Sequence, residues 1–206
     1  MEIDLSTLPS RRAHDLLTSG VIPRPIAWVS SISAAGQVNL APFSFFTGVT
    51  WNPPTLCFSP VNRADGTRKD TVLNIEATGQ YVINVVSEEL ASRMVQTAAT
   101  LPPETDEASE AGIPLVPSTV VRAPRVAQAK VAFECVLDRI VTVGVGADTG
   151  NLILGTVKLM HVSDDVLAPG PAVDWEKLHV LGRLSGTKYC AVHAAFDIDP
   201  QADQTG

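Results

Sequence analysis

Charge is scarce in this chain. Charged residues make up 18% of its 206 residues, and hydrophobic residues make up 45%. An average soluble domain is about 25% charged. A disordered chain has the opposite composition, so this one is predicted to be globular. The length fits one domain over residues 1–206, with peripheral tails at 1–15 and 197–206. The low charge also suggests more buried surface than a monomer needs, and therefore an oligomer.

Basic residues are fewer than acidic ones, 15 against 22, for a formal net charge of −7. The chain therefore lacks the positive footprint of a nucleic-acid or anionic-membrane binder. It has no run of eighteen apolar residues, and the segment from Met1 to Leu8 has no signal-peptide core. We expect neither a nucleic-acid partner nor a membrane span.

Metal-binding patterns are also missing. The three cysteines (Cys57, Cys135 and Cys190) form no CxxC motif or Cys/His cluster, and the four histidines show no ligand spacing. We expect three reduced thiols, a cytoplasmic location and no metal site.

One long segment is free of charge altogether. Pro25 to Asn62 contains no Asp, Glu, Lys or Arg, and its five prolines exclude a membrane helix. Such a segment is typical of strands buried on both faces. We expect strands at 26–32, 40–50 and 55–59, with a hairpin turn at Ala35-Gly36.

The rest of the chain continues the pattern of strands with few helices. Helices are predicted at 70–78, ending at Gly79, and from Ser87 to about Ala99. Further strands are predicted at 81–86, 131–143, 152–162 and 188–193, with a surface excursion at 102–124 and a helical turn at 173–178. The fold class is therefore mainly β with peripheral helices, as a closed or nearly closed antiparallel barrel.

A basic cluster precedes the first of these helices. Arg63, Arg68 and Lys69 lie just before the helix that begins near Asp70 and Thr71. Free amides and the helix dipole favour an anion at such a place. The alternative is a solvated loop with Asp70 as an ordinary N-cap.

The segment Asn39-Leu-Ala-Pro-Phe-Ser-Phe-Phe46 allows two interpretations. Its phenylalanines are typical of a core. Pro42 opening a strand, with Ser44 between Phe43 and Phe45, also suits a flat aromatic ligand.

Two glycine-rich segments also stand out. Gly144 to Gly150 leads into a strand, so it is predicted as a hairpin turn and not as a dinucleotide loop. Around Gly182 to Tyr189, the side chains of Arg183, Lys188 and Tyr189 are as compatible with a ligand as with a plain loop.

Two acidic residues and a histidine lie on the long strands. Glu134 and Asp138 share one face of a strand, which favours a solvated face over a catalytic carboxylate pair. His161 ends the next strand and is predicted to be a satisfied or edge histidine.

Taken together, these segments resemble a known family. The motifs that carry the resemblance are Pro23-Arg-Pro-Ile-Ala-Trp-Val-Ser-Ser31, Asn39–Phe46, Arg68-Lys-Asp-Thr-Val-Leu-Asn74, Tyr81-Val-Ile-Asn-Val85, Phe133-Glu-Cys-Val-Leu137, Gly155-Thr-Val157 and Leu181-Gly-Arg-Leu-Ser-Gly186. In order and spacing they resemble the flavin reductase-like, FMN-binding split-barrel proteins. These include flavoredoxins and the reductase components of two-component monooxygenases.

The resemblance implies a homodimeric split barrel with FMN in a groove near the dimer interface. The residues implied to line the flavin ring and ribityl chain are Ser30, Ser31, Ala41, Pro42, Phe43, Ser44 and Phe45. Those implied to hold the ribityl–phosphate end are Ser59, Lys69, Asp70 and Thr71, with Tyr189 near the flavin.

The resemblance further implies hydride transfer from NADH or NADPH to flavin, with reduced flavin or electrons passed to a monooxygenase or another acceptor protein. One departure from the family pattern matters. Its shorter members carry a nicotinamide-linked Gly-Asp-His triplet, whereas this chain has Asp148-Thr149 without the histidine. His161 is the only histidine nearby, so it is the candidate catalytic residue. The alternative function is a flavoredoxin-like electron carrier with tightly bound FMN and no direct NAD(P)H oxidation.

Overall fold

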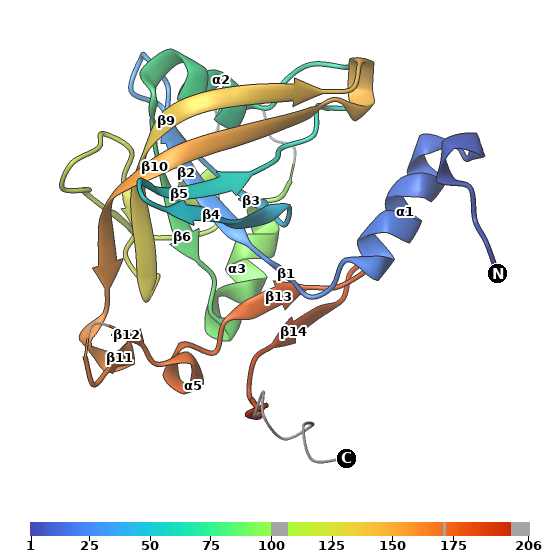
Figure 1. Cartoon of the computed structure of the whole chain (residues 1–206). Coiled ribbons are helices and arrows are strands. Elements are labelled where there is room, and N and C mark those ends of the chain that lie inside the picture. The colour runs from blue at the N-terminus through green and yellow to red at the C-terminus, as the bar shows by residue number, and fades with distance from the viewer. Residues whose placement is uncertain (100–106, 171, 199–206) are drawn as a thin grey trace.

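The computed structural model describes residues 1–99, 107–170 and 172–198. A seven-stranded sheet dominates it, in the order β3-β2-β6-β9-β10-β5-β4, with every neighbouring pair antiparallel (Figure 1). Its strands are β2 (Ala27–Ile32), β3 (Val38–Phe43), β4 (Phe46–Trp51), β5 (Pro54–Phe58), β6 (Gln80–Val85), β9 (Val131–Val143) and β10 (Gly150–Val162).

The sheet is open between β3 and β4, which form its two edges. The prediction of one strand over 40–50 is wrong, because the chain breaks at Ser44 and Phe45. Within the described residues no ladder joins β3 to β4, so the sheet is a split barrel and not a closed one. This break lies next to the cleft described below.

The predicted turns and the long hairpin are confirmed. Gly36, at φ 93°, supports the turn between β2 and β3, and its amide donates to Ser33 O at 3.0 Å. β9 has the predicted bounds, and Gly144 to Gly150 is the turn that leads into β10. The segment forms a β-hairpin with no helix after it, which excludes the dinucleotide loop.

The helices are α1 (Ser10–Gly20), α2 (Asp70–Thr78), α3 (Ala91–Gln96), α4 (Glu107–Glu110) and α5 (Trp175–Leu178), with 3₁₀ turns at 5–7, 88–90, 146–148 and 164–166. α2 has the predicted bounds because Gly79 adopts the left-handed conformation that ends it, at φ 70°. α3 is shorter than the predicted helix. α1 was not predicted. The predicted N-terminal tail ended at residue 15, which lies within this helix. Among the described helices, none has the length and apolar character needed to cross a membrane.

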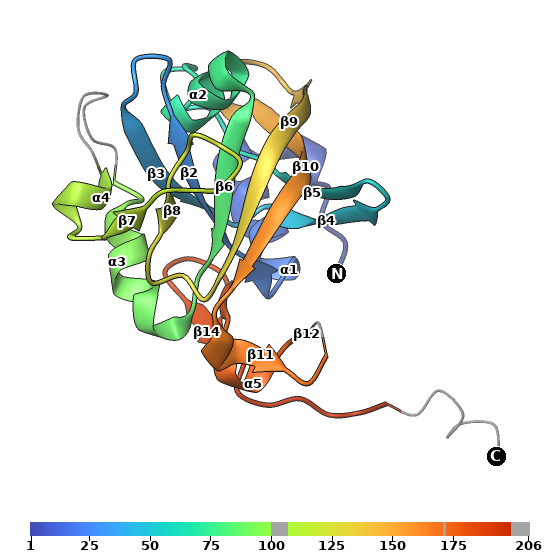
Figure 2. The ribbon, with the colours of Figure 1, turned by 90° about the vertical axis from the view of Figure 1, so that its left-hand side faces the viewer.

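Short strands form the rest of the fold. β1 (Arg24–Pro25), β13 (Leu181–Arg183) and β14 (Tyr189–Ala191) make a three-stranded sheet beside the barrel. β7 (Leu115–Val116) pairs with β8 (Arg125–Val126), and β11 (Leu167–Ala168) pairs with β12 (Ala172–Val173). Figure 2 shows α3 and α4 along the β3 side of the sheet, and α5 with β11 and β12 at its lower end. Part of the predicted 102–124 excursion, and most of the predicted 197–206 tail, lies outside the described residues.

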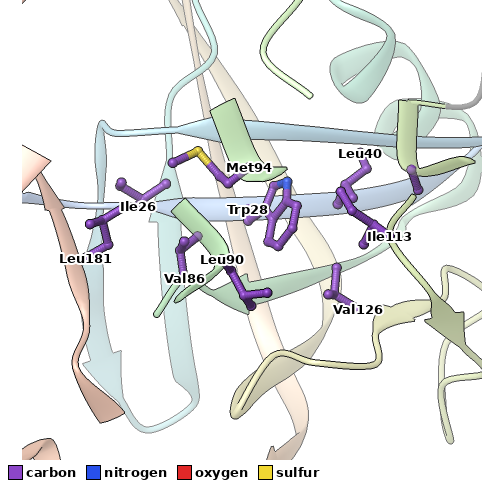
Figure 3. Close-up of a cluster of buried hydrophobic side chains, with 10 residues drawn as sticks. Ile26, Trp28, Leu40, Val86, Leu90, Met94, Ile113, Val126 and Leu181 are labelled. Atoms are coloured by element: carbon purple, nitrogen blue, oxygen red, sulfur yellow. The ribbon is translucent and has the colours of Figure 1, made fainter. Parts of the chain in front are cut away.

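The two larger of three hydrophobic clusters hold most of these layers together. One joins the outer face of the sheet to α3 around the fully buried Trp28, whose Nε1 donates to Thr97 Oγ1 at 2.9 Å (Figure 3). The other fills the barrel interior and includes Phe43, Phe58 and Tyr81. There β10 needs Gly155, because a Cβ at that position would lie 1.9 Å from the Tyr81 hydroxyl oxygen.

Candidate functional site

Two adjoining cavities lie where β3 ends. The larger, of about 340 Å³, is lined by Arg11, His14, Asp15, Thr18, Arg24, Ile26, Pro42, Phe43, Ser44, Phe45, Met94, Ala98, Arg183, Leu184, Gly186 and Tyr189. The smaller, of about 100 Å³, is lined by Asn39, Ala41, Pro42, Arg63, Lys69, Asp70, Thr71, Thr97, Ala98, Ala99 and Glu107. Pro42 and Ala98 belong to both linings, so the two form one elongated cleft. Its larger part has the size of a typical small-molecule site.

The edge of β3 forms the wall common to both cavities. The amide of Leu40 points away from β2 and donates to Glu107 Oε2 at 3.2 Å. Because backbone groups alternate in direction along a strand, those of Pro42 also face this free edge. Proline has no N–H to contribute to a ladder, so an edge strand tolerates it. The break after Phe43 then leaves Ser44 and Phe45 free to line the cleft.

The smaller cavity holds a lysine that has no ion-pair partner among the described residues. Lys69 is half-buried, and no described carboxylate forms an ion pair with it; its Nζ lies 5.5 Å from the centroid of the Phe43 ring. Burial lowers the pKa of Lys69, and the charge of Arg63 lowers it further. Lys69 is also the N-cap position of α2, and its side chain does not cap the helix. Free amides and a buried ammonium together favour an anion here.

The neighbours of Lys69 are paired with one another. Arg63 Nη2 lies 2.5 Å from Asp70 Oδ2, so these two charges balance. The side-chain amide of Asn39 lies 2.9 Å from Thr71 Oγ1, and both of these side chains are buried. This arrangement fixes the start of α2, and Lys69 is left as the cation of this cavity that forms no ion pair within the described part of the chain.

A buried guanidinium supports the larger cavity. Arg24 is 5% exposed, and its Nη1 donates to Thr18 O at 2.6 Å and to Val21 O at 2.7 Å. Its Nη2 donates to Leu184 O at 2.8 Å, and its Nε donates to Ser44 Oγ at 3.3 Å. All four partners are neutral. Arg24 therefore ties the end of α1 to Ser44, just after β3, and to the β13–β14 loop. It brings to the cleft a positive charge that forms no ion pair with a described residue.

The rim of the larger cavity comes from α1 and from the β13–β14 hairpin. Arg183 Cζ lies 4.4 Å from the centroid of the Tyr189 ring, and its guanidinium hydrogen-bonds the Tyr189 hydroxyl. From α1, Arg11 and His14 approach Asp15 at 3.5 and 3.1 Å. The lining has three arginines against one carboxylate, so this cleft is cationic in an acidic protein.

The structure brings most of the predicted binding residues together. Those that line the cleft are Ala41, Pro42, Phe43, Ser44, Phe45, Lys69, Asp70, Thr71 and Tyr189. Phe43 is also part of the barrel core, so both interpretations of the 39–46 segment apply.

Three of the predicted residues do not belong to either lining. Ser30 and Ser31 are fully buried; Ser30 Oγ donates to Pro124 O, and Ser31 Oγ accepts from Asn74 Nδ2 at 3.2 Å. Ser59 donates its amide to Phe45 O at 2.9 Å, so it contacts the cleft through the break in the sheet. Their role with a ligand stays a prediction.

His161 lies in a different environment. Its Nε2 is 2.6 Å from Oε1 of Glu134, and His161 is absent from both cavity linings. This placement favours the satisfied histidine over the nicotinamide contact.

The expectation of a solvated face is wrong for Glu134, which is fully buried. Its carboxylate accepts from the amides of Thr119, Val120 and Val121 at 2.6–3.0 Å. Burial by itself raises the pKa of Glu134, but the His161 contact and these three amides outweigh it and leave the pKa below its ordinary value. Glu134 therefore anchors the 119–121 loop over the sheet.

Sequence reasoning missed the contribution of α1 and of Arg24. The missed lining residues are Arg11, His14, Asp15, Thr18 and Arg24, together with Met94, Ala98 and Leu184. Pro9 immediately before Ser10 is a helix-start signal that would have pointed to α1.

Comparison with known proteins confirms the fold and identifies the family to which the chain belongs. The profile described as the flavin reductase like domain matches residues 19–179. The chain belongs to this family. It is 41% identical over 189 residues to an uncharacterized protein of Aquifex aeolicus, an alignment covering 92% of this chain and 94% of that protein.

Three solved structures resemble this flavin reductase-like protein. Nitrilotriacetate monooxygenase component B from Bacillus cereus has a TM-score of 0.91 at 32% identity, covering 96% of this chain and 98% of that one. The 2-nitrobenzoate 2-nitroreductase NbaA of Pseudomonas fluorescens has a TM-score of 0.88 at 29% identity, with both chains fully covered. The flavoredoxin of Desulfovibrio vulgaris shares the fold at a TM-score of 0.73 and 18% identity, covering 89% and 94%.

Proposed function

We propose that this chain binds FMN in the cleft and acts as an NAD(P)H-dependent flavin reductase. The observation that carries the proposal is the charge pattern of the cleft. A half-buried, unpaired Lys69 lies at the start of α2, at one end of a cavity whose other part is lined by Pro42, Ser44 and Phe45. A ligand with a flat ring at one end and a phosphate at the other matches this pattern.

The phosphate end would be held by Lys69 and the first amides of α2. Lys69 supplies a charge-assisted hydrogen bond, and the phosphate would replace the water that its ammonium loses on burial. The pair Arg63–Asp70 keeps the helix start in place. Thr71 already contacts Asn39 through its hydroxyl, so its part is to order the site.

The ring end would lie along Ala41 to Phe45. The edge of β3 offers backbone groups to the ring, and Arg24 with Arg183 provides positive charge nearby. When bound, FMN accepts a hydride from a reduced nicotinamide, and this step needs no acid, base or nucleophile from the protein. The residues of this chain bind and orient the two molecules and limit water in the cleft.

We further propose a homodimer. The support is exposed apolar surface on elements near the cleft: Trp51 is 90% exposed on β4, and Leu17, Val21, Ile22 and Val49 are each about half exposed. Isolated exposed apolar residues are common, but an exposed apolar surface that is contiguous marks an interaction site, and we propose that these residues form one. The likeness to a monooxygenase component B supports an oxygenase as the acceptor of reduced flavin.

The electron carrier is the second candidate, and one observation favours it. The only histidine of the long hairpin, His161, is bound to Glu134 and not to the cleft, so it offers a nicotinamide no contact there. A flavoredoxin-like protein would hold FMN in the same cleft and would receive electrons from another protein.

One experiment separates the two. The purified protein is loaded with FMN and mixed anaerobically with NADH or NADPH while flavin absorbance is followed. Bleaching within seconds supports the reductase. Oxidised FMN that persists under excess NADH and NADPH supports the carrier, and failure to bind FMN contradicts both.

A further inference from the structure

Three side chains that are distant in sequence meet outside the cleft. Glu88, His179 and His193 offer ligand atoms that all lie within 4.8 Å of one another. His193 Nε2 is 3.0 Å from Glu88 Oε2, and the two imidazole centroids are 5.1 Å apart. Sequence spacing gave no sign of a metal site because the residues come from three separate segments. All three side chains are exposed, so a solvated ion has access to them.

Backbone hydrogen bonds fix the segments that carry these side chains. The amide of Glu88 donates to His179 O at 3.0 Å, and Ser87 forms an antiparallel bridge with Val180. On the other side, the amide of Val192 donates to Val180 O at 3.1 Å. The three segments are therefore joined by backbone hydrogen bonds, and the three side chains that could bind a metal lie at the same end of this arrangement. Figure 1 shows α5 close to β13 and β14 at this end of the molecule.

The conformation of His179 is unusual. Within the described residues it is the one non-glycine residue with positive φ, at φ 47° and ψ 50°. It occupies the position that ends α5, where glycine is the common choice. A non-glycine residue keeps the left-handed backbone conformation where its surroundings fix it, and such residues occur at binding sites. Here that conformation directs the imidazole toward His193.

The nearby cations do not compete for the carboxylate. Lys130 lies 3.6 Å from Glu89 and 3.9 Å from Asp165, and Lys177 lies 3.3 Å from Asp174. These two lysines are paired with other carboxylates, so the Glu88 carboxylate is available to bind an ion together with the two imidazoles. Small rotations of the exposed side chains bring all three ligand atoms to one ion.

We propose that Glu88, His179 and His193 form a binding site for a divalent transition-metal ion such as Zn²⁺. Two imidazoles and one carboxylate are the ligand set of three-residue zinc sites, and water completes the tetrahedron. Imidazole ligands select against Mg²⁺ and Ca²⁺, which prefer oxygen.

The ion links the C-terminal strand to the barrel. β14 carries Tyr189, and the 3₁₀ turn at Glu88 leads into α3, which carries Met94; both residues line the larger cavity. A metal ion bound by His193 and Glu88 therefore connects the segment that follows β14 to the turn that leads into α3. Metal binding is predicted to stabilise this end of the molecule.

The test is a calorimetric titration of the EDTA-treated full chain with ZnCl₂, together with its melting temperature. We expect one Zn²⁺ per chain with micromolar or tighter affinity, and a melting temperature raised by about 5 °C at a hundredfold excess over Kd. Hydrogen exchange of residues 189–193 is expected to slow when Zn²⁺ is bound. MgCl₂ is expected to produce none of these effects.

Single-ligand variants locate the site. His179→Asn keeps a residue that tolerates the left-handed conformation, and His193→Gln and Glu88→Gln keep size and polarity. Each is expected to weaken Zn²⁺ at least tenfold. Glu89→Gln, on the same turn but outside the cluster, is the matched control and is expected to bind like the parent. Absence of binding at millimolar Zn²⁺, or equal affinity in all four variants, overturns the proposal.

Discussion

Two charged groups in different regions of the molecule, Glu134 on β9 and Lys69 at the start of α2, differ in how their charges are satisfied. Glu134 is fully buried and accepts three backbone amides and a histidine. Lys69 is half-buried at the start of α2, and among the described residues no carboxylate pairs with it. The first group meets its hydrogen-bonding needs within the chain, whereas the second does not.

This difference distinguishes a charged group that stabilises the fold from one that is expected to bind a ligand. A buried charge with a full set of partners holds elements together, and removing it costs folding free energy. A buried charge without a partner is costly unless a ligand supplies one. The Glu134 cluster is therefore assigned to the fold, and Lys69 is assigned to ligand binding.

Glu134→Ala is expected to have the largest effect. The change leaves three loop amides without acceptors and removes the partner of His161, so unfolding free energy should fall by about 3–5 kcal/mol. Urea denaturation measures this. FMN affinity of the folded fraction should be unchanged. A loss below about 1 kcal/mol would show that the loop is not anchored through Glu134.

Lys69→Ala is expected to weaken FMN by about ten- to a hundredfold, which corresponds to ~1.5–3 kcal/mol for one charge-assisted contact. Stability should change little or rise, because an unpaired buried cation is removed. Fluorescence titration measures the affinity. Lys158→Ala, an exposed lysine on β10, is the matched control and should bind FMN like the parent.

His161→Ala tests whether this histidine supports the fold, as Glu134 does, or contacts a ligand, as is proposed for Lys69. Losing its contact to the Glu134 carboxylate should lower unfolding free energy by about 1.5 kcal/mol. The rate of anaerobic flavin reduction should stay within about twofold of the parent. A tenfold slower reduction at unchanged stability would return His161 to the nicotinamide site.

The smallest effect concerns pH. The folded-state pKa of Glu134 lies below its ordinary value of 4.5, so folding favours the charged carboxylate. The stability it contributes is present above pH 4.5 and is lost as pH falls through the folded-state pKa. Unfolding free energy of the parent should therefore fall more steeply below pH 4.5 than that of Glu134→Gln. Parallel curves would contradict this assignment.

Local signals made the part of the cleft at the start of α2 predictable. Three basic residues before a helix start, and Gly79 at its end, placed α2 and Lys69 correctly because both signals act within one turn. The break at Ser44 and the burial of Glu134 were not predictable in this way. They depend on the split of the sheet and on the 119–121 loop, which are contacts between distant segments. The contribution of α1 to the cleft also depends on contacts between distant segments, because Arg24 links Thr18 of α1 to Leu184.

The most direct test of the account compares FMN with riboflavin, which lacks the phosphate. Both ligands are titrated into the parent protein and into Lys69→Ala. The account predicts that the parent prefers FMN by at least tenfold and that Lys69→Ala loses most of this preference while its riboflavin affinity stays nearly constant. Equal losses for both ligands would show that Lys69 does not contact the phosphate, and would contradict the assignment of the cleft.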